Sequence, residues 1–98
     1  MTTEQLVHVA KALAHPARLQ IIEQFSGCRP RTVHDIVADS NLAQSTVSEH
    51  LRILRDAEVV FVTRDGAWNW YCVRRSVLAE FAIAVEHLAR QPSPVPGR

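Results

Sequence analysis

The chain has 98 residues with 11 basic and 10 acidic side chains, so it is the length of one small domain and carries a formal net charge of +1. No apolar run reaches the ~18 residues of a membrane-spanning helix, no secretion signal is recognisable at the start, and two cysteines favour a reducing compartment, so we expect a cytoplasmic protein without a membrane partner. The charge is too low to mark a non-specific nucleic-acid binder, and any DNA-binding function must therefore be argued from motifs.

Two helices are expected in the first quarter of the chain. One of the first two threonines can cap a first helix that runs through Ala14, whose apolar residues recur at helical spacing. Pro16 fits the first turn of a second helix that continues to about Phe25. Gly27 is expected to end this second helix, and residues 28–31 then form a loop.

A helix-turn-helix is expected next. Thr32 is the predicted cap of a short helix over 33–38, and Asp35 follows three residues later as in a capping box. The polar residues 39–41 supply a turn before a second helix over 44–56. The first turn of that helix holds short polar side chains, which suit contacts with base edges and phosphates. Its apolar stripe consists of Val47, Leu51 and Leu54.

Two strand-like runs follow, over 59–63 and 68–73, and both are rich in β-branched and aromatic residues. Residues 64–67 lie between them and contain an Asp-Gly pair, which favours a tight hairpin. A helix-turn-helix followed by such a hairpin is the layout of a winged helix-turn-helix. We therefore predict an α+β domain, mainly α, with about five helices and a two-stranded wing. The aromatic residues expected to pack this hairpin onto the core, rather than stack on single-stranded bases, are Trp68, Trp70 and Tyr71.

Three stretches of the chain resemble repressors of the ArsR family. Residues 12–22 read ALAHPARLQII, residues 42–54 read LAQSTVSEHLRIL and residues 66–71 read GAWNWY. They occur in the family's order, and the resemblance extends from about residue 6 to residue 88. It implies a homodimeric transcriptional regulator, most simply a repressor. Such a protein would bind double-stranded operator DNA with an inverted repeat and would be released by an unidentified small-molecule or redox effector.

The resemblance also indicates how DNA would be contacted. The helix over 44–56 would be the recognition helix in the major groove, and the wing tip would touch the neighbouring backbone or minor groove. The predicted DNA-binding residues are Gln44, Ser45, Thr46, Ser48, Glu49, Arg52, Arg64 and Gly66. Ala43 is a departure, because the family often has a serine there that caps the recognition helix. Loss of such a cap costs about 1 kcal/mol.

The last predicted helix, over 76–90, has apolar residues on more than one face, so it must bury the surplus against another surface. In the family this helix packs against its own copy, with the first helix beside it. The predicted dimer interface consists of Leu6, Val9, Leu13, Leu78, Phe81, Val85 and Leu88. The domain is expected to cover residues 1–91, and the Pro-rich residues 92–98 are expected to form a disordered tail.

Catalytic and metal-binding functions find little support in the residues. The chain has no Gly-rich phosphate loop and no recognised nucleophile motif, so we predict neither enzymatic activity nor a cofactor. The family's thiolate site would need cysteines where Thr32 and His34 stand. Its other metal site, on the last helix, would need ligands where this chain has Arg74, Ser76 and Arg90. We therefore predict no metal site.

Two alternatives remain open from the sequence. The protein could be a metal-sensing or thiol-redox-sensing repressor of the same fold, in which Cys28 beside Arg29 is the more reactive thiol and Cys72 is packed in a strand. It could also be a winged-helix module that binds protein, for which the near-neutral charge is the argument. His50 follows the family pattern and is expected to support the recognition helix rather than to bind a metal.

Overall fold

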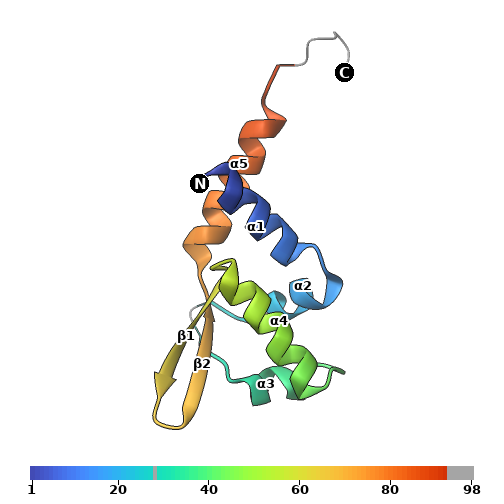
Figure 1. The fold of residues 1–98 in the computed structure, drawn as a ribbon, viewed down its shortest axis with the longest axis vertical. Coiled ribbons are helices and arrows are strands. Elements are labelled where there is room, and N and C mark those ends of the chain that lie inside the picture. The colour runs from blue at the N-terminus through green and yellow to red at the C-terminus, as the bar shows by residue number, and fades with distance from the viewer. Residues whose placement is uncertain (28, 93–98) are drawn as a thin grey trace.

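The computed structural model describes residues 1–27 and 29–92. Within these ranges the chain forms five helices and a two-stranded antiparallel sheet (Figure 1), which confirms the predicted α+β winged helix-turn-helix layout. The described part has no helix long and apolar enough to cross a membrane. The elements in chain order are α1 (Thr3–Leu13), α2 (Pro16–Glu23), α3 (Val33–Ala38), α4 (Gln44–Asp56), β1 (Val60–Asp65), β2 (Trp68–Val73) and α5 (Arg75–Ala89).

The start of each of the first three helices is fixed by a side chain that satisfies a free backbone N–H group. Thr2 and Gln5 form a capping box at α1, and Thr32 and Asp35 form the predicted one at α3. At α2 the cap is His15, whose Nδ1 accepts from the N–H of Ala17 at 3.1 Å.

The end of α2 differs from the prediction. The helix stops at Glu23, because the N–H of Phe25 bonds to the carbonyl of Ile22 only three residues back and the chain tightens there. The Phe25 side chain then turns into the core. Gly27 has a positive φ of 56°, but it lies in the following loop and does not cap the helix.

The core surrounds α4. Its residues Val47, Leu51 and Leu54 have no exposed surface, and α4 packs against α1, α2, α3 and β1. The remaining core residues come from those neighbours and the hairpin: Val9, Ala12, Ile21, Phe25, Ile36, Val59, Val60 and Val73. The helix predicted to read DNA is therefore also the central packing element of the domain. This packing holds the exposed side of α4 in a fixed position.

The hairpin is longer than predicted at its first strand. β1 and β2 pair from Val60 opposite Val73 to Asp65 opposite Trp68, so the turn is only Gly66 and Ala67. Gly66 has φ of 59°, and a two-residue hairpin with glycine at its first turn position needs that left-handed conformation. Beyond the hairpin, Arg31 forms an isolated bridge with Tyr71 through two main-chain hydrogen bonds.

The last helix, α5, begins one residue earlier than predicted and extends away from the rest of the domain (Figure 1). None of its residues is fully buried. Near its start Val77, Leu78 and Phe81 pack partly against the core. Further along, Ile83 and Leu88 are exposed by 67% and 60%, so much of its apolar surface meets nothing within a single chain.

Candidate nucleic-acid interface

The N-terminal part of α4 presents a polar surface. All predicted contact residues of this helix are exposed, while the opposite side of the helix is fully buried in the core. Ala43 precedes the helix with extended backbone and makes no side-chain cap, so the first-turn N–H groups remain for water or for an anion such as a phosphate. The exposed set comprises Gln44, Ser45, Thr46, Ser48, Glu49 and Arg52.

Arg52 already has two carboxylate partners. Its guanidinium donates to both carboxylate oxygens of Glu49, at 3.0 and 2.6 Å, and to Asp56 at 2.9 Å. Hydrogen bonding to Arg52 lowers the pKa of Glu49, and the same bond raises the pKa of Arg52. All three side chains are more than half exposed, where ion pairs exchange readily. The predicted phosphate contact therefore requires Arg52 to leave one of these partners.

His50 lies on the buried side of α4 and joins it to α2. The imidazole is 9% exposed, its Nδ1 accepts from Arg18 Nη1 at 3.3 Å, and its ring centroid lies 4.7 Å from that of His15. Burial, followed by the neighbouring His15 and Arg18, lowers the pKa of His50. The sequence predicted that His50 supports the recognition helix. For the contributions of Arg18 and His15, the only signal in the sequence was their place in residues 12–22, which resemble the ArsR family.

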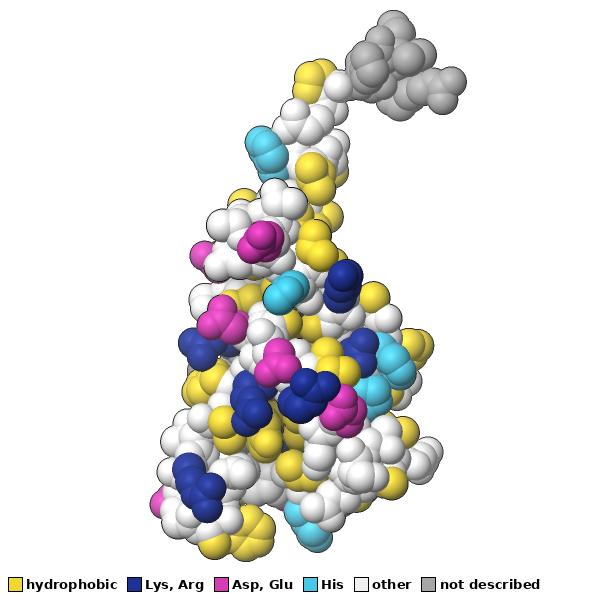
Figure 2. Space-filling view, in the orientation of Figure 1, with side chains coloured by type: hydrophobic (Ala, Val, Ile, Leu, Met, Phe, Trp, Pro, Cys, Tyr) yellow, Lys and Arg dark blue, Asp and Glu magenta, His cyan; other side chains and the backbone are white. Residues whose placement is uncertain are grey.

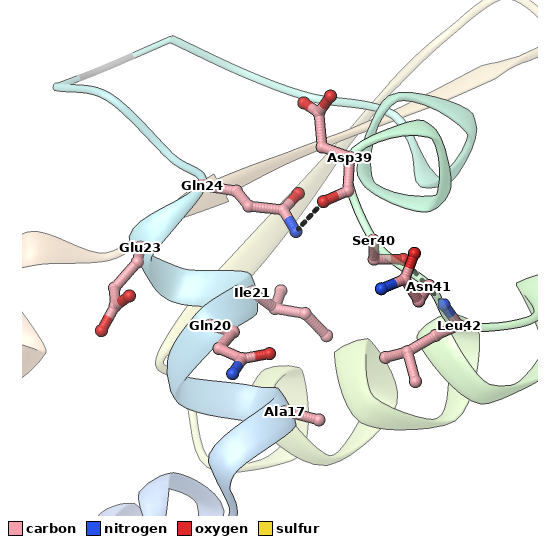
Figure 3. Close-up of a pocket in the computed structure, with 9 residues that line it drawn as sticks. All are labelled: Ala17, Gln20, Ile21, Glu23, Gln24, Asp39, Ser40, Asn41 and Leu42. Atoms are coloured by element: carbon pink, nitrogen blue, oxygen red, sulfur yellow. Dashed lines mark hydrogen bonds between the residues drawn. The ribbon is translucent and has the colours of Figure 1, made fainter.

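Arg31 joins the end of α2 to α3 and to the turn that follows α3. Its guanidinium donates to the Gln24 side chain at 3.0 Å, to the Asp35 carbonyl at 3.1 Å, and forms an ion pair with Asp39. A hollow of about 400 Å³ lies beside this junction, between α2 and the turn that precedes α4 (Figure 3). One side of the hollow is closed by the Gln24 amide, which donates to the Asp39 carbonyl at 3.4 Å.

The wing carries exposed basic and aromatic side chains at its end. Arg64 and Gly66 are exposed as predicted contacts require, and Trp68 is 59% exposed. Figure 2 shows basic and hydrophobic side chains side by side at this lower end of the molecule. The expectation that both tryptophans pack the hairpin onto the core is wrong, because strand alternation turns Tyr71 toward the core and places Trp68 and Trp70 on the opposite face.

The face of the hairpin that holds the two tryptophans also forms a shallow apolar hollow of about 390 Å³. Cys72 lies there, half-buried in β2 as predicted. At the base of the same face, the Arg74 guanidinium stacks over the Phe61 ring at 4.9 Å. The hollow is lined by Pro30, Thr63, Asp65, Trp70 and Cys72.

The described residues contain no group of three His, Cys, Asp or Glu side chains placed to hold a metal ion. The prediction that no family metal site operates stays a prediction, because an ion can be completed by a second chain. Cys28, the thiol singled out in the sequence, lies outside the described residues, as do residues 93–98 of the predicted tail.

The predicted dimer surface is partly available on the single chain. Val85 and Leu88 are 44% and 60% exposed, and the leucines predicted on α1 are half-buried. Val9 is a correction, because at 2% exposed it belongs to the chain's own core and has no surface left for a partner. Two apolar residues outside the predicted set are also exposed, Val7 on α1 and Ile83 on α5. Figure 2 shows the hydrophobic side chains that run along α5.

Comparisons with known proteins place this arrangement among bacterial regulators. A sequence profile described as "Bacterial regulatory protein, arsR family" matches residues 15–61. An uncharacterised HTH-type transcriptional regulator of Mycobacterium tuberculosis is 40% identical over 82 residues, which are 82% of this chain and 71% of that protein. The transcriptional repressor SdpR of Bacillus subtilis is 33% identical over 74% of this chain and 80% of its own length.

A solved structure adds the three-dimensional comparison. The homodimeric winged helix-turn-helix DNA-binding domain from Mycobacterium bovis, solved by NMR and described as that of a possible ArsR-family transcriptional regulator, superposes with a TM-score of 0.71. It is 29% identical in sequence, and the match covers 94% of this chain and 89% of that one.

Proposed function

We propose that this protein, which belongs to the ArsR family of bacterial regulatory proteins, is a cytoplasmic transcriptional repressor. It binds double-stranded operator DNA as a homodimer. The observation that carries this proposal is the division of α4 into two sides. Val47, Leu51 and Leu54 anchor one side without any exposed surface, while the polar first turns of the other side are fully open. This arrangement presents short donors and acceptors on a rigid helix, as major-groove recognition requires.

Each contact residue has a distinct role in the proposed complex. Gln44 pairs with an adenine in the major groove, and the hydroxyls of Ser45, Thr46 and Ser48 bind bases or phosphates. Arg52 exchanges a carboxylate partner for a phosphate, and Glu49 keeps it oriented until then. Arg64 and Gly66 bring the wing tip to the neighbouring backbone.

The dimer places two such units on one operator. The exposed apolar residues of α5, with α1 beside it, supply the surface between the two chains. A symmetric dimer reads an inverted repeat whose half-sites lie about one helical turn, or ~10 bp, apart. A small-molecule or redox effector would release the DNA by favouring a dimer geometry that no longer matches two successive grooves.

The test measures binding of the purified protein to the duplex upstream of its own gene. Fluorescence anisotropy at several salt concentrations gives the affinity. We expect the natural duplex to bind more tightly than a scrambled duplex of the same composition, and both affinities to fall as salt rises. Equal affinities for the two duplexes, or no binding to either, would contradict sequence-specific repression.

A further inference from the structure

Three side chains meet where the recognition helix crosses the corner between α1 and α2. Arg18 of α2 donates through Nε to the Ala12 carbonyl at 2.6 Å and through Nη2 to the Lys11 carbonyl at 3.4 Å, both at the end of α1. Its remaining Nη1 donates to His50 of α4 at 3.3 Å. One guanidinium therefore joins α1, α2 and α4, and the His15 ring lies against the His50 ring at 4.7 Å.

The partners of both imidazoles determine their protonation. The guanidinium of Arg18 and the backbone N–H of Ala17 can only donate, so the Nδ1 atoms of His50 and His15 that they contact must accept. An Nδ1 that accepts carries no proton, and a neutral ring then carries its proton on Nε2. The Arg18 contact thus favours the neutral Nε2–H form of His50, and the cap of α2 needs an unprotonated Nδ1 on His15.

We propose that His15, Arg18 and His50 form an acid-labile clasp that positions the recognition helix on the α1–α2 corner, so that acidification weakens operator binding. This inference rests on the proposed function for its DNA readout. Protonating His50 at Nδ1 replaces an acceptor with a donor facing a guanidinium, and protonating His15 at Nδ1 removes the cap of α2. Either event breaks a bond that the closed clasp needs.

The surrounding charges set the sign of the effect. His15 and Arg18 face His50 from α2, and Glu49 lies next to it on α4, while α1 meets the guanidinium through main-chain carbonyls. Burial, followed by the neighbouring His15 and the Arg18 guanidinium, holds the pKa of His50 below its ordinary value, and Glu49 opposes them only in part. A released, solvated imidazole binds protons near pH ~6.5. Falling pH therefore favours release of the clasp, and rising pH favours closure.

The consequence for DNA binding follows from which helices are joined. α1 lies beside α5 and carries part of the proposed dimer surface, whereas α4 carries the base-reading residues. Within the described residues, the Arg18–His50 hydrogen bond joins α4 to this corner, and the buried residues Val47, Leu51 and Leu54 of α4 pack in the apolar core. Losing this hydrogen bond lets α4 shift slightly against α1 and α2 while the apolar core keeps it packed, and a small shift is enough to prevent two half-sites from being matched at once.

The experiment removes protonation while keeping both hydrogen bonds. In His15→Asn the amide still caps α2, and in His50→Gln the side-chain oxygen still accepts from Arg18. Between about pH 7.5 and about pH 5.5 we expect the unmodified protein to lose about tenfold in operator affinity, while the double variant loses less than about threefold. His34→Gln, which removes an exposed imidazole on α3, is the matched control and should keep the full loss.

A second readout needs no DNA. Nitrogen-15 NMR of the imidazoles near neutral pH should show an unprotonated Nδ1 and a protonated Nε2 in His50. If the double variant does not fold by circular dichroism, the single variant His50→Gln takes its place in the DNA-binding assay and should lose less affinity on acidification than the unmodified protein.

The outcomes separate this inference from the proposed function. If the unmodified protein binds no duplex, the proposed function fails and the NMR result alone decides the clasp. If the protein binds but the variant and parent lose affinity equally on acidification, the clasp is overturned while the function stands. A protonated Nδ1 on His50 near neutral pH would also overturn it. So would a loss of folded structure in acid by both the parent and the double variant.

Discussion

At the scale of single residues, Gln44 and Arg52 are expected to behave differently. Gln44→Ala should lose roughly 1–3 kcal/mol on the true operator and relax the preference at one base pair, because the amide pairs with a base edge. Arg52→Ala should weaken binding to all sequences alike and reduce the salt dependence by about one unit per contact. Anisotropy titrations of both variants on specific and scrambled duplexes would measure these changes.

The ion pairs of Arg52 provide a control for that experiment. Glu49→Gln removes a carboxylate that holds the guanidinium at 2.6 Å, so it should strengthen binding to scrambled DNA. If Arg52→Ala and Glu49→Gln shift affinity in the same direction, the arginine does not reach phosphate. If Gln44→Ala stays folded and binds like the parent, the recognition surface lies elsewhere on α4.

A second residue-scale prediction concerns pH and the cap of α3. The N–H of Thr32 donates to the Asp35 carboxylate at 3.0 Å, and this bond holds the pKa of Asp35 below its ordinary value. A carboxylate with a lowered folded pKa stabilises the fold above its unfolded pKa, and that stability is lost as pH falls through the folded pKa. Asp35→Asn should therefore lower the free energy of unfolding by about 1 kcal/mol at neutral pH.

The difference between Asp35→Asn and the parent should shrink as pH falls through the folded pKa of Asp35 and disappear once its carboxyl group is protonated. Urea denaturation of both proteins at neutral and at acid pH measures it. A difference that stays constant with pH would show that the carboxylate charge does not stabilise α3.

Residues whose partners are near in sequence were predictable, whereas those with distant partners were not. The Thr32 and Asp35 cap is visible in the sequence because both residues lie within one turn. Arg18 and Arg31 are indistinguishable from surface arginines until the fold brings Ala12, His50, Gln24 and Asp39 around them. The exposed side of α4 was predictable from periodicity, while the carboxylate partners of Arg52 depend on rotamers that periodicity does not specify.

At the scale of elements, the missing cap of α4 can be restored. Ala43 has φ of −69° and ψ of 154° and makes no side-chain bond to the helix, which is the backbone conformation that a capping serine adopts. Ala43→Ser should raise the free energy of unfolding by about 1 kcal/mol. Chemical denaturation would show this as a higher midpoint with an unchanged slope.

Ala43→Val is the matched control for the capping serine, because valine offers no hydroxyl and is as poor an N-cap as alanine. A serine variant no more stable than the parent and the valine variant would mean that the first turn of α4 is already satisfied by another partner.

Element boundaries were predicted less well than element types, for physical reasons. β1 extends two residues further than expected because the tight turn uses Gly66 and Ala67 rather than four residues. α2 ends early because Phe25 enters the core. The burial of tryptophans was also mispredicted, because alternation alone does not tell which face of a two-stranded hairpin meets the domain.

At the scale of the whole molecule, the exposed apolar face of α5 predicts the oligomeric state. Ile83 is 67% exposed in the single chain, so Ile83→Asp should leave the fold intact and disrupt association. Phe81 is a poorer probe, because it packs partly against its own core. Light scattering at micromolar concentration should give a dimer for the unmodified protein and a monomer for this variant.

The control for association is Leu19→Asp, which changes a 45% exposed leucine on α2 away from the proposed interface. This variant should remain dimeric. An unmodified protein that scatters as a monomer, or an Ile83→Asp variant that still dimerises, would refute the proposed interface.

The lack of any fully buried residue in α5 has a consequence for the lifetime of the protein in the cell. A helix of 15 residues is marginal when it is not packed, so an unpaired chain exposes a frayed end to proteases. Binding to a second copy adds stability in proportion to the logarithm of concentration. Newly made chains would therefore be degraded fastest when they are scarce, and their turnover would slow as they accumulate. We expect proteolytic half-life to lengthen with protein concentration, so that the level of the regulator responds steeply to the rate of its own synthesis.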